Sequence, residues 1–198
     1  MGYIFYLMGK SSSGKDTIYR KLLAREELGL RRVVPYTTRP IREGEEDGKE
    51  YFFIDDNTVE KLREQGAIIE LRAYDTCHGI WKYMTVDDGT WVNDDRDCLM
   101  IGTLEAYGKM CEYFGPDKIV PVMVVLDDGV RLQRALNRER KQENPKYEEL
   151  CRRFLADAKD FSPEALEAAG VRRFYENEDL KKCVNEIAEM ILSKRKGQ

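Results

Sequence analysis

The segment GKSSSGKDT at residues 9–17 constrains this chain more than any other, because it directly follows the apolar run YIFYLM at 3–8. A buried strand that turns through a Gly- and Ser-rich loop into a helix is the setting of a phosphate-binding P-loop. Glycines in such a loop let successive N–H groups curl around a phosphate, while a lysine and the helix dipole add positive charge. The predicted phosphate-binding residues are Gly9, Ser11, Ser12, Ser13, Gly14, Lys15, Asp16 and Thr17.

Asp16 departs from the strict pattern GxxxxGK[ST], which has Ser or Thr at this position, and Thr17 comes one residue late. The missing hydroxyl is the one that usually contacts Mg²⁺. The simpler alternative is a Ser/Gly turn with an exposed lysine. The segment lies between an apolar strand and an amphipathic helix with Ile18, Leu22 and Leu23 on one side, and this context favours the P-loop.

Length and composition indicate one globular domain over residues 1–198. The net charge of −4, with both signs interspersed, argues against a nucleic-acid surface, and the apolar run at 119–126 is too short to cross a membrane. Five cysteines without a CxxC pair indicate reduced thiols. We therefore expect a cytoplasmic protein with small-molecule partners, either monomer or homodimer.

Apolar patterning predicts an α/β fold in three layers, with a parallel central sheet wrapped by helices. Continuous apolar runs predict buried strands, and apolar residues at helical spacing, three or four positions apart, predict amphipathic helices. The expected strands are 3–8, 97–101, 118–126 and 171–175, and the expected helices are 15–28, 104–111, 130–141, 147–160 and 180–191.

Two segments stand apart from this core, which comprises about 1–31, 96–136 and 154–198. Residues 32–95 are predicted to form a small mixed or antiparallel insertion of short strands and polar turns. Its strand candidates are Arg32–Val34, Glu50–Ile54 and Ala67–Leu71. Residues 137–153 are almost wholly polar, which fits either a mobile flap carrying arginines or a solvated helical hairpin.

A second cluster of charged residues, PYTTRPIREGEEDGKEYFF, occupies residues 35–53. Arg39 and Arg42 lie three apart across a proline, and two guanidinium groups held this way suit a phosphate monoester. Tyr51 can donate a third hydrogen bond. The alternative is a pair of surface arginines balanced by the acidic residues of the same segment.

The stretch TTRPIREGEEDGKEYFF at 37–53 resembles the guanylate kinase signature TTRxPRxGExDGxDYxF. The resemblance runs from the P-loop through the final helix and weakens after residue 71. It implies transfer of the γ-phosphoryl group of ATP to GMP with Mg²⁺, with ATP on the P-loop. By the same resemblance, residues 32–95 would bind the monophosphate, 137–153 would form a helical lid, and Arg39, Arg42 and Tyr51 would hold the phosphate of GMP.

Glu70 matches the guanine-reading glutamate of that family. Guanine presents adjacent N1–H and N2–H₂ donors, which one carboxylate can accept together, whereas adenine presents an acceptor at N1. The alternative is a surface glutamate on an edge strand.

Other base-contacting positions depart from the family pattern. Pro35 and Ile80 stand where hydroxyl residues are expected, His78 stands where a phosphate-binding tyrosine is expected, and Thr103 replaces an acidic base contact. His78 and Thr103 are retained as candidate GMP contacts. These changes weaken guanine specificity more than phosphoryl transfer, so dGMP or another or modified nucleotide remains an alternative acceptor.

The strand sequence IGT at 101–103 lacks both aspartates of the family motif, while Asp16 has appeared beside the nucleotide phosphates. An uncompensated carboxylate about 4 Å from a phosphate charge is repelled by about 4 kcal/mol at an effective dielectric of 20. The hypothesis is that Asp16 binds Mg²⁺. The alternative is that Thr17 or backbone groups suffice.

Phosphoryl transfer depends on alignment and charge neutralisation rather than on covalent catalysis. The expected catalytic residues are Lys15, Arg42, Arg138 and Arg153, the last two placed by the resemblance, with Arg134 and Arg152 as competitors. A catalytically silent binding module, as some guanylate-kinase-like domains are, is a different class of function. The presence of the lysine and both arginines favours the enzyme.

Overall fold

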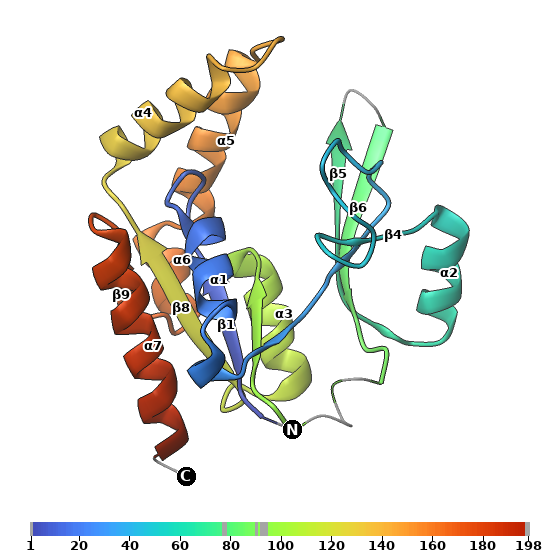
Figure 1. The fold of residues 1–198 in the computed structure, drawn as a ribbon. Helices are drawn as coiled ribbons and strands as arrows, with labels where there is room; N and C mark the ends of the chain where they lie inside the picture. The colour runs from blue at the N-terminus through green and yellow to red at the C-terminus, as the bar shows by residue number, and fades with distance from the viewer. Residues whose placement is uncertain (1, 77–78, 90, 92–94, 197–198) are drawn as a thin grey trace.

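The computed structural model describes residues 2–76, 79–89, 91 and 95–196. Its core is a five-stranded sheet in which all paired neighbours run parallel, as Figure 1 shows. The order across the sheet is β2 (Arg31–Arg32), β7 (Cys98–Ile101), β1 (Ile4–Met8), β8 (Ile119–Val125) and β9 (Phe174–Glu176). The apolar P-loop strand therefore occupies the centre, where both faces are covered.

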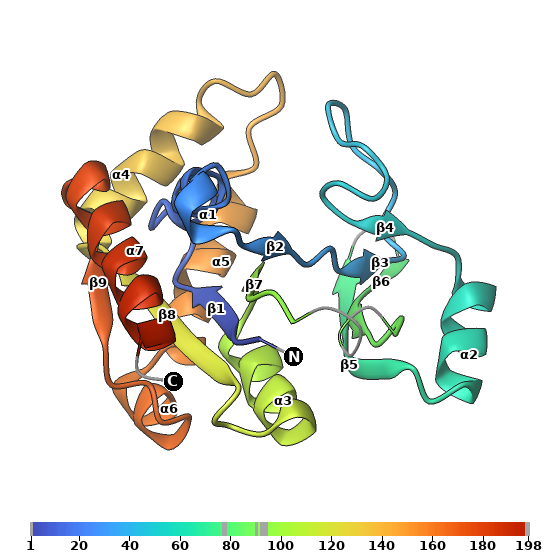
Figure 2. The same cartoon turned by 60° about the horizontal axis from the view of Figure 1, so that its bottom comes forward.

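The central strand β1 supplies side chains to two separate apolar clusters because successive residues of a strand point to opposite faces. Ile4, Tyr6 and Met8 pack with α3 (Leu104–Phe114) and α6 (Pro163–Ala168). Phe5 and Leu7 pack with α1 (Lys15–Leu23) and α7 (Leu180–Lys196). Helices thus cover both faces (Figure 2), and the predicted three-layer fold with a parallel sheet is confirmed.

A hairpin of α4 (Asp128–Glu139) and α5 (Tyr147–Asp160) rises beyond the end of the sheet at which β1 enters the P-loop. The expected helices 130–141 and 147–160 correspond to this pair. The polar segment predicted as a flap comprises the end of α4, the connection 140–146 and the start of α5.

The insertion forms a second, four-stranded sheet of mixed direction, with order β4-β3-β6-β5. One helix packs on it through the buried side chain of Val59, which joins Met84 and Val86 in a small core of their own. The elements are β3 (Tyr36–Thr37), β4 (Phe52–Phe53), α2 (Asp56–Glu64), β5 (Ile68–Thr76) and β6 (Gly79–Val86).

Three details of the sequence interpretation were wrong. The strand candidate Arg32–Val34 belongs to the core, because Arg31 donates its N–H to the carbonyl of Asp97 at 2.8 Å and β2 pairs with β7. Helix α2 was not predicted, because Val59 is its one buried residue. The helix expected over 15–28 ends at Leu23 and is followed by a short 3₁₀ turn, Glu26–Leu28. Among the described helices, none has the length and apolar character needed to span a membrane.

Candidate functional site

The loop between β1 and α1 adopts backbone angles that its glycines permit. Gly14 has φ +89°, and a Cβ atom there would lie 2.3 Å from Nδ2 of Asn177. A Cβ atom on Gly9 would lie 2.5 Å from the carbonyl oxygen of Val124. Ser12, with φ 63°, is the non-glycine residue with positive φ in the described part of the chain. The loop is therefore closely packed against β8 and the segment after β9, and it holds one strained conformation.

The inside of this loop offers hydrogen-bond groups that no described residue satisfies. Gly14 caps α1 without any side-chain acceptor, and the N–H groups of Gly14, Lys15 and Asp16 have no acceptor among the described residues. The hydroxyls of Ser12 and Ser13 are buried and also lack a described partner. Since an unpaired buried polar group costs about 1–3 kcal/mol, this arrangement fits an anion that would satisfy several of these groups at once.

Two cations complete the electrostatics of the loop. Lys15 is half-buried and forms no ion pair with a described residue, in contrast to Lys10, which binds Asp128 at 3.3 Å. Arg134 on α4 reaches toward the loop, because its Nη1 lies 3.7 Å from where a Cβ atom of Gly14 would be. It too has no acidic partner in the described structure. Positive charge therefore lies at the uncapped end of α1.

The helical hairpin is fixed to the P-loop by a buried arginine that the sequence interpretation missed. Arg131 donates Nε–H to the carbonyl of Ser11 at 2.9 Å, contacts Asp157 through Nη2 at 2.9 Å and stacks over Phe154. Asp157 accepts the N–H of Ser11 at 2.7 Å. An arginine among several on a charged helix carries no local signal of this role. The contacts tie the base of the hairpin, not its tip, to the loop.

The predicted lid arginines lie in different surroundings. Arg138 is exposed on α4 and forms no ion pair with any residue the structure describes. Arg152 and Arg153 both bind Glu149 on α5, each at 2.7 Å. The hydrogen bond from Arg152 is the largest cause that lowers the pKa of Glu149 to about 2. Arg153 is thus engaged within its own helix, whereas Arg134 and Arg138 are not.

In the insertion, Arg39 is buried and rigidly held. Its guanidinium binds both carboxylate oxygens of Glu45, at 2.9 and 2.8 Å, and its Cζ lies 5.4 Å from the ring centroids of both Tyr51 and Phe53. Glu45 also accepts the backbone N–H of Arg42 at 2.8 Å, while the Arg42 side chain is exposed. The hydrogen bond that Glu45 accepts from Arg39 is the main cause that lowers the pKa of the Glu45 carboxyl. The three predicted phosphate ligands Arg39, Arg42 and Tyr51 therefore belong to one small cluster.

Glu70 lies on β5, the edge strand of the insertion that packs next to α3. The alternative of a surface glutamate is wrong, because the residue is 5% exposed. Its carboxylate accepts hydrogen bonds from Nε of Arg72 at 2.9 Å, from Nη2 of Arg72 at 3.3 Å and from the hydroxyl of Thr85 at 2.8 Å. Arg72 also donates Nη1–H to the hydroxyl of Thr103 at 3.2 Å. The structure thus joins two predicted base contacts through an arginine that was not predicted.

Asp16 and Thr17 begin α1, with Asp16 exposed, while His78 lies outside the described residues. No group of three or more acidic, His or Cys side chains in the described residues could hold a metal by itself. Mg²⁺ commonly uses one or two carboxylates, water and substrate phosphates, so an isolated aspartate beside a phosphate cradle suits it. Asp16 as a magnesium ligand stays a prediction.

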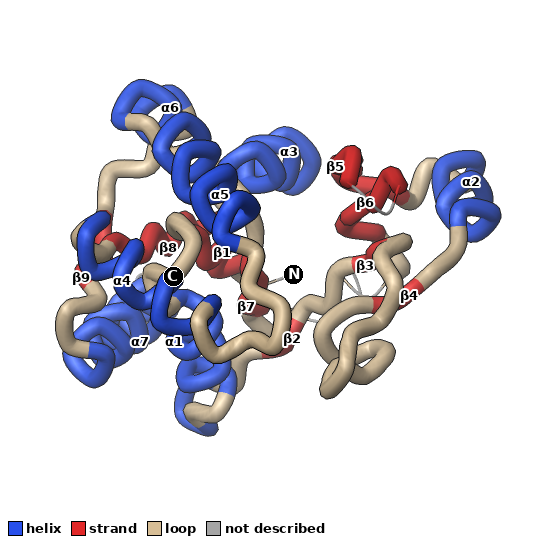
Figure 3. Tube along the Cα trace, turned by 90° about the horizontal axis from the view of Figure 1, so that it is seen from above, coloured by secondary structure: helices blue, strands red, loops and turns tan. Residues whose placement is uncertain are grey.

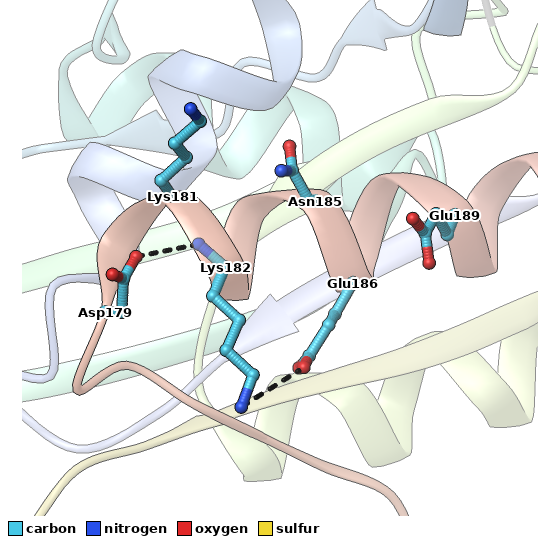
Figure 4. A pocket seen from close by; sticks show the side chains of 6 residues that line it. All are labelled: Asp179, Lys181, Lys182, Asn185, Glu186 and Glu189. Carbon is cyan, nitrogen blue, oxygen red and sulfur yellow. Dashed lines mark hydrogen bonds and ion pairs between the residues drawn. The ribbon is translucent and has the colours of Figure 1, made fainter.

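Seen from above in Figure 3, the insertion, with β3 to β6 and α2, lies to one side of the core that carries the α4–α5 hairpin. A separate hollow lies along α7 (Figure 4) and shares no residue with the P-loop or the insertion. Lys182 and Glu186 in its lining form an ion pair along the helix at 3.9 Å. It is lined by Asp179, Lys181, Lys182, Asn185, Glu186 and Glu189.

Comparison with known proteins identifies the family. Residues 3–79, which contain the P-loop and the arginine cluster, match the guanylate kinase family model. These matches support membership of the guanylate kinase family. A guanylate kinase from Rhodopseudomonas palustris (strain HaA2) is 40% identical over 79 aligned residues, which are 39% of this chain and 36% of that protein. In such local matches the chain spans just over a third of the relative's length.

Alignments that cover nearly the whole chain show lower sequence identity. A guanylate kinase from Caldanaerobacter subterraneus subsp. tengcongensis is 25% identical over 98% of this chain and 88% of its own length. The crystal structure of guanylate kinase from Anaplasma phagocytophilum superposes with a TM-score of 0.66 at 24% identity, covering 98% of this chain and 86% of that one. The fold is therefore similar to that of a guanylate kinase along 98% of this chain, while the family model matches only residues 3–79.

Proposed function

We propose that this guanylate kinase family member transfers the γ-phosphoryl group of ATP to GMP, giving ADP and GDP. The observation that carries the proposal is the P-loop cradle. Its N–H groups at residues 14–16 and the hydroxyls of Ser12 and Ser13 have no described partner. The phosphates of ATP would satisfy these groups, and Lys15 would neutralise part of their charge.

The acceptor would bind on the insertion. Arg42 and Arg39 would hold the phosphate of GMP with Tyr51, while Glu70 would meet the base. Only some of the guanidinium N–H groups of Arg39 are available to this phosphate, because two of them donate to Glu45. Glu45 would thereby hold Arg39 in a fixed orientation before the phosphate arrives.

Alignment and charge neutralisation would supply the catalysis. Lys15, Arg42 and the arginines of the hairpin would surround the group being transferred. Arg134 and Arg138 are better placed for this than Arg153, which Glu149 engages. Residues 137–153 would act as a lid and the insertion as the monophosphate-binding unit, both closing over the core to exclude water. Mg²⁺, held by Asp16, would supply neutralisation of phosphate charge when bound.

A coupled assay of ADP formation with ATP, Mg²⁺ and a panel of nucleoside monophosphates tests the proposal. GMP should be among the phosphorylated acceptors. Lys15→Met should lower kcat/KM by about 10²-fold or more, as expected for loss of an electrostatic contact to the transferred group. Lys21→Met, on the exposed side of the same helix, provides the control with an equal change of charge. Absence of turnover with every monophosphate, despite ATP-dependent thermal stabilisation, would favour a silent binding module instead.

A further inference from the structure

Arg72 is the charged group with the most unusual position outside the predicted site. Its side chain is 14% exposed on β5 and connects Glu70 to Thr103, which lies across from the insertion at the start of α3. Both of these partners are candidate contacts of the acceptor base. Arg72 therefore lies where the base would be recognised.

The hydrogen bonds around Arg72 determine what remains available to a ligand. A guanidinium has five N–H donors, and three are used by Glu70 and Thr103. One N–H on Nη1 and one on Nη2 remain. A carboxylate has about four acceptor sites, and Glu70 uses three of them for Arg72 and Thr85. The pair consequently offers two donors but only one further acceptor.

One free acceptor site on Glu70 is too few to accept both N1–H and the 2-amino group of guanine, because those two donors need two acceptor sites. The two donors and one acceptor of the pair instead match the neighbouring N1–H and O6 of a 6-oxopurine. Glu70 would accept N1–H, and Arg72 would donate to O6, as arginine commonly does to the O6 of guanine in nucleic acids. Adenine would place its N1 acceptor against Glu70 and its 6-amino donor against Arg72.

We propose that Arg72 is a specificity-determining residue that reads O6 together with Glu70, so that the site selects 6-oxopurine monophosphates with little dependence on the 2-amino group. This inference rests on the proposed phosphoryl transfer to a nucleoside monophosphate. It names the feature of the acceptor base that the site recognises. Hypoxanthine and guanine nucleotides share that feature.

Steady-state kinetics with GMP, IMP and AMP as acceptors test the inference on the unmodified protein. The kcat/KM for IMP should lie within about tenfold of that for GMP, because loss of one unread group has a small effect. The kcat/KM for AMP should be at least about 10²-fold lower than that for GMP, because adenine places an acceptor against Glu70 and a donor against Arg72. Discrimination of more than about 10²-fold between GMP and IMP would overturn the inference while leaving the GMP kinase proposal intact.

Arg72→Lys and Arg72→Met separate recognition from folding. Lysine keeps the charge beside Glu70 but loses the fork, so the preference for IMP over AMP should fall by tenfold or more. Methionine frees acceptor sites on Glu70, so the GMP-to-IMP ratio should rise by about tenfold. Arg63→Met, on exposed α2 where Arg63 pairs with Glu60 at 2.9 Å, is the matched control and should change neither ratio.

If Arg72→Met does not fold, the lysine variant and the unmodified acceptor panel still decide the matter. Unchanged acceptor ratios in a folded Arg72→Lys protein would overturn the role of Arg72. Failure of every monophosphate, including GMP, would instead reject the proposed function on which the inference depends.

Discussion

Replacing Gly14 by alanine tests the claim that the phosphate cradle is held by close packing as well as by a left-handed backbone. Gly14 has φ +89°, and its added Cβ atom would lie 2.3 Å from Nδ2 of Asn177. Gly29, which follows the 3₁₀ turn Glu26–Leu28, is also left-handed, with φ +49°, but the nearest heavy atom to its added Cβ atom would be the carbonyl oxygen of Glu26 at 4.0 Å. The two glycines therefore both lie in the left-handed region and differ in their surroundings.

The expected magnitudes follow from this difference. A left-handed alanine costs about 1–2 kcal/mol, and the lower entropy of the unfolded chain offsets about 0.4–1 kcal/mol of it. Gly29→Ala should thus lower the free energy of unfolding by about 0.5–1.5 kcal/mol. Gly14→Ala must also displace Asn177, which donates Nδ2–H to the carbonyl of Ser13 at 2.7 Å. Loss of that buried hydrogen bond adds about 1–3 kcal/mol.

Urea unfolding followed by circular dichroism measures the free energy of unfolding of both variants. The double variant Gly14→Ala/Asn177→Ala completes a double-mutant cycle between these two positions. Removal of the Asn177 amide should reduce the additional cost of Gly14→Ala, giving a coupling of about 0.5–3 kcal/mol. Thermal stabilisation by ATP should be lost in Gly14→Ala and retained in Gly29→Ala. A Gly14→Ala variant no less stable than Gly29→Ala, with no coupling to Asn177, would refute the reasoning.

Three further substitutions probe the loop and the hairpin. Arg131→Met should lower the free energy of unfolding by about 3–5 kcal/mol, because it leaves the partly buried Asp157 without its cation; Arg134→Met should instead lower turnover at nearly unchanged stability in the same urea and kinetic assays. Asp16→Ala should raise the Mg²⁺ concentration needed for half-maximal rate, and an unchanged Mg²⁺ dependence would contradict Asp16 as a ligand. Glu149→Gln should cost well under 1 kcal/mol at pH 7, since the pair is exposed. Because the folded pKa of Glu149 is lowered to about 2 from 4.5, that cost is fully present above pH 4.5 and should vanish as pH falls toward 2; a cost that persists at pH 2 would contradict the ion-pair explanation.

The core of the fold was predictable because its signals are local. The apolar runs at 3–8 and 118–126 and the amphipathic segment 147–160 correspond to β1, β8 and α5. The insertion was less predictable because β3 and β4 have only two residues each and most residues of β5 and β6 are half-buried or exposed, so that pairing rather than hydrophobic period defines these strands. Strand β6 pairs with β5 from Gly79 to Val86. The turn signals at its two ends, Gly79 and Asp88–Gly89, were not used in the sequence interpretation.

The same distinction divides the site itself. A P-loop binds phosphate through consecutive backbone N–H groups and glycine conformations, so nine adjacent letters suffice to indicate it. Other contacts of the site form only after folding. Arg72 reaches Thr103 across 31 positions, where the base would bind, and Arg131 reaches the carbonyl of Ser11 across 120 positions, at the P-loop. The residues next to each arginine in sequence do not indicate these distant partners. Glu70 was predicted as a base contact from one residue and the chemistry of guanine, but its capacity to accept hydrogen bonds depends on Arg72 and Thr85. Assignment of a substrate from a single glutamate therefore requires the full set of its hydrogen bonds, and here that set favours O6 and N1–H over the 2-amino group.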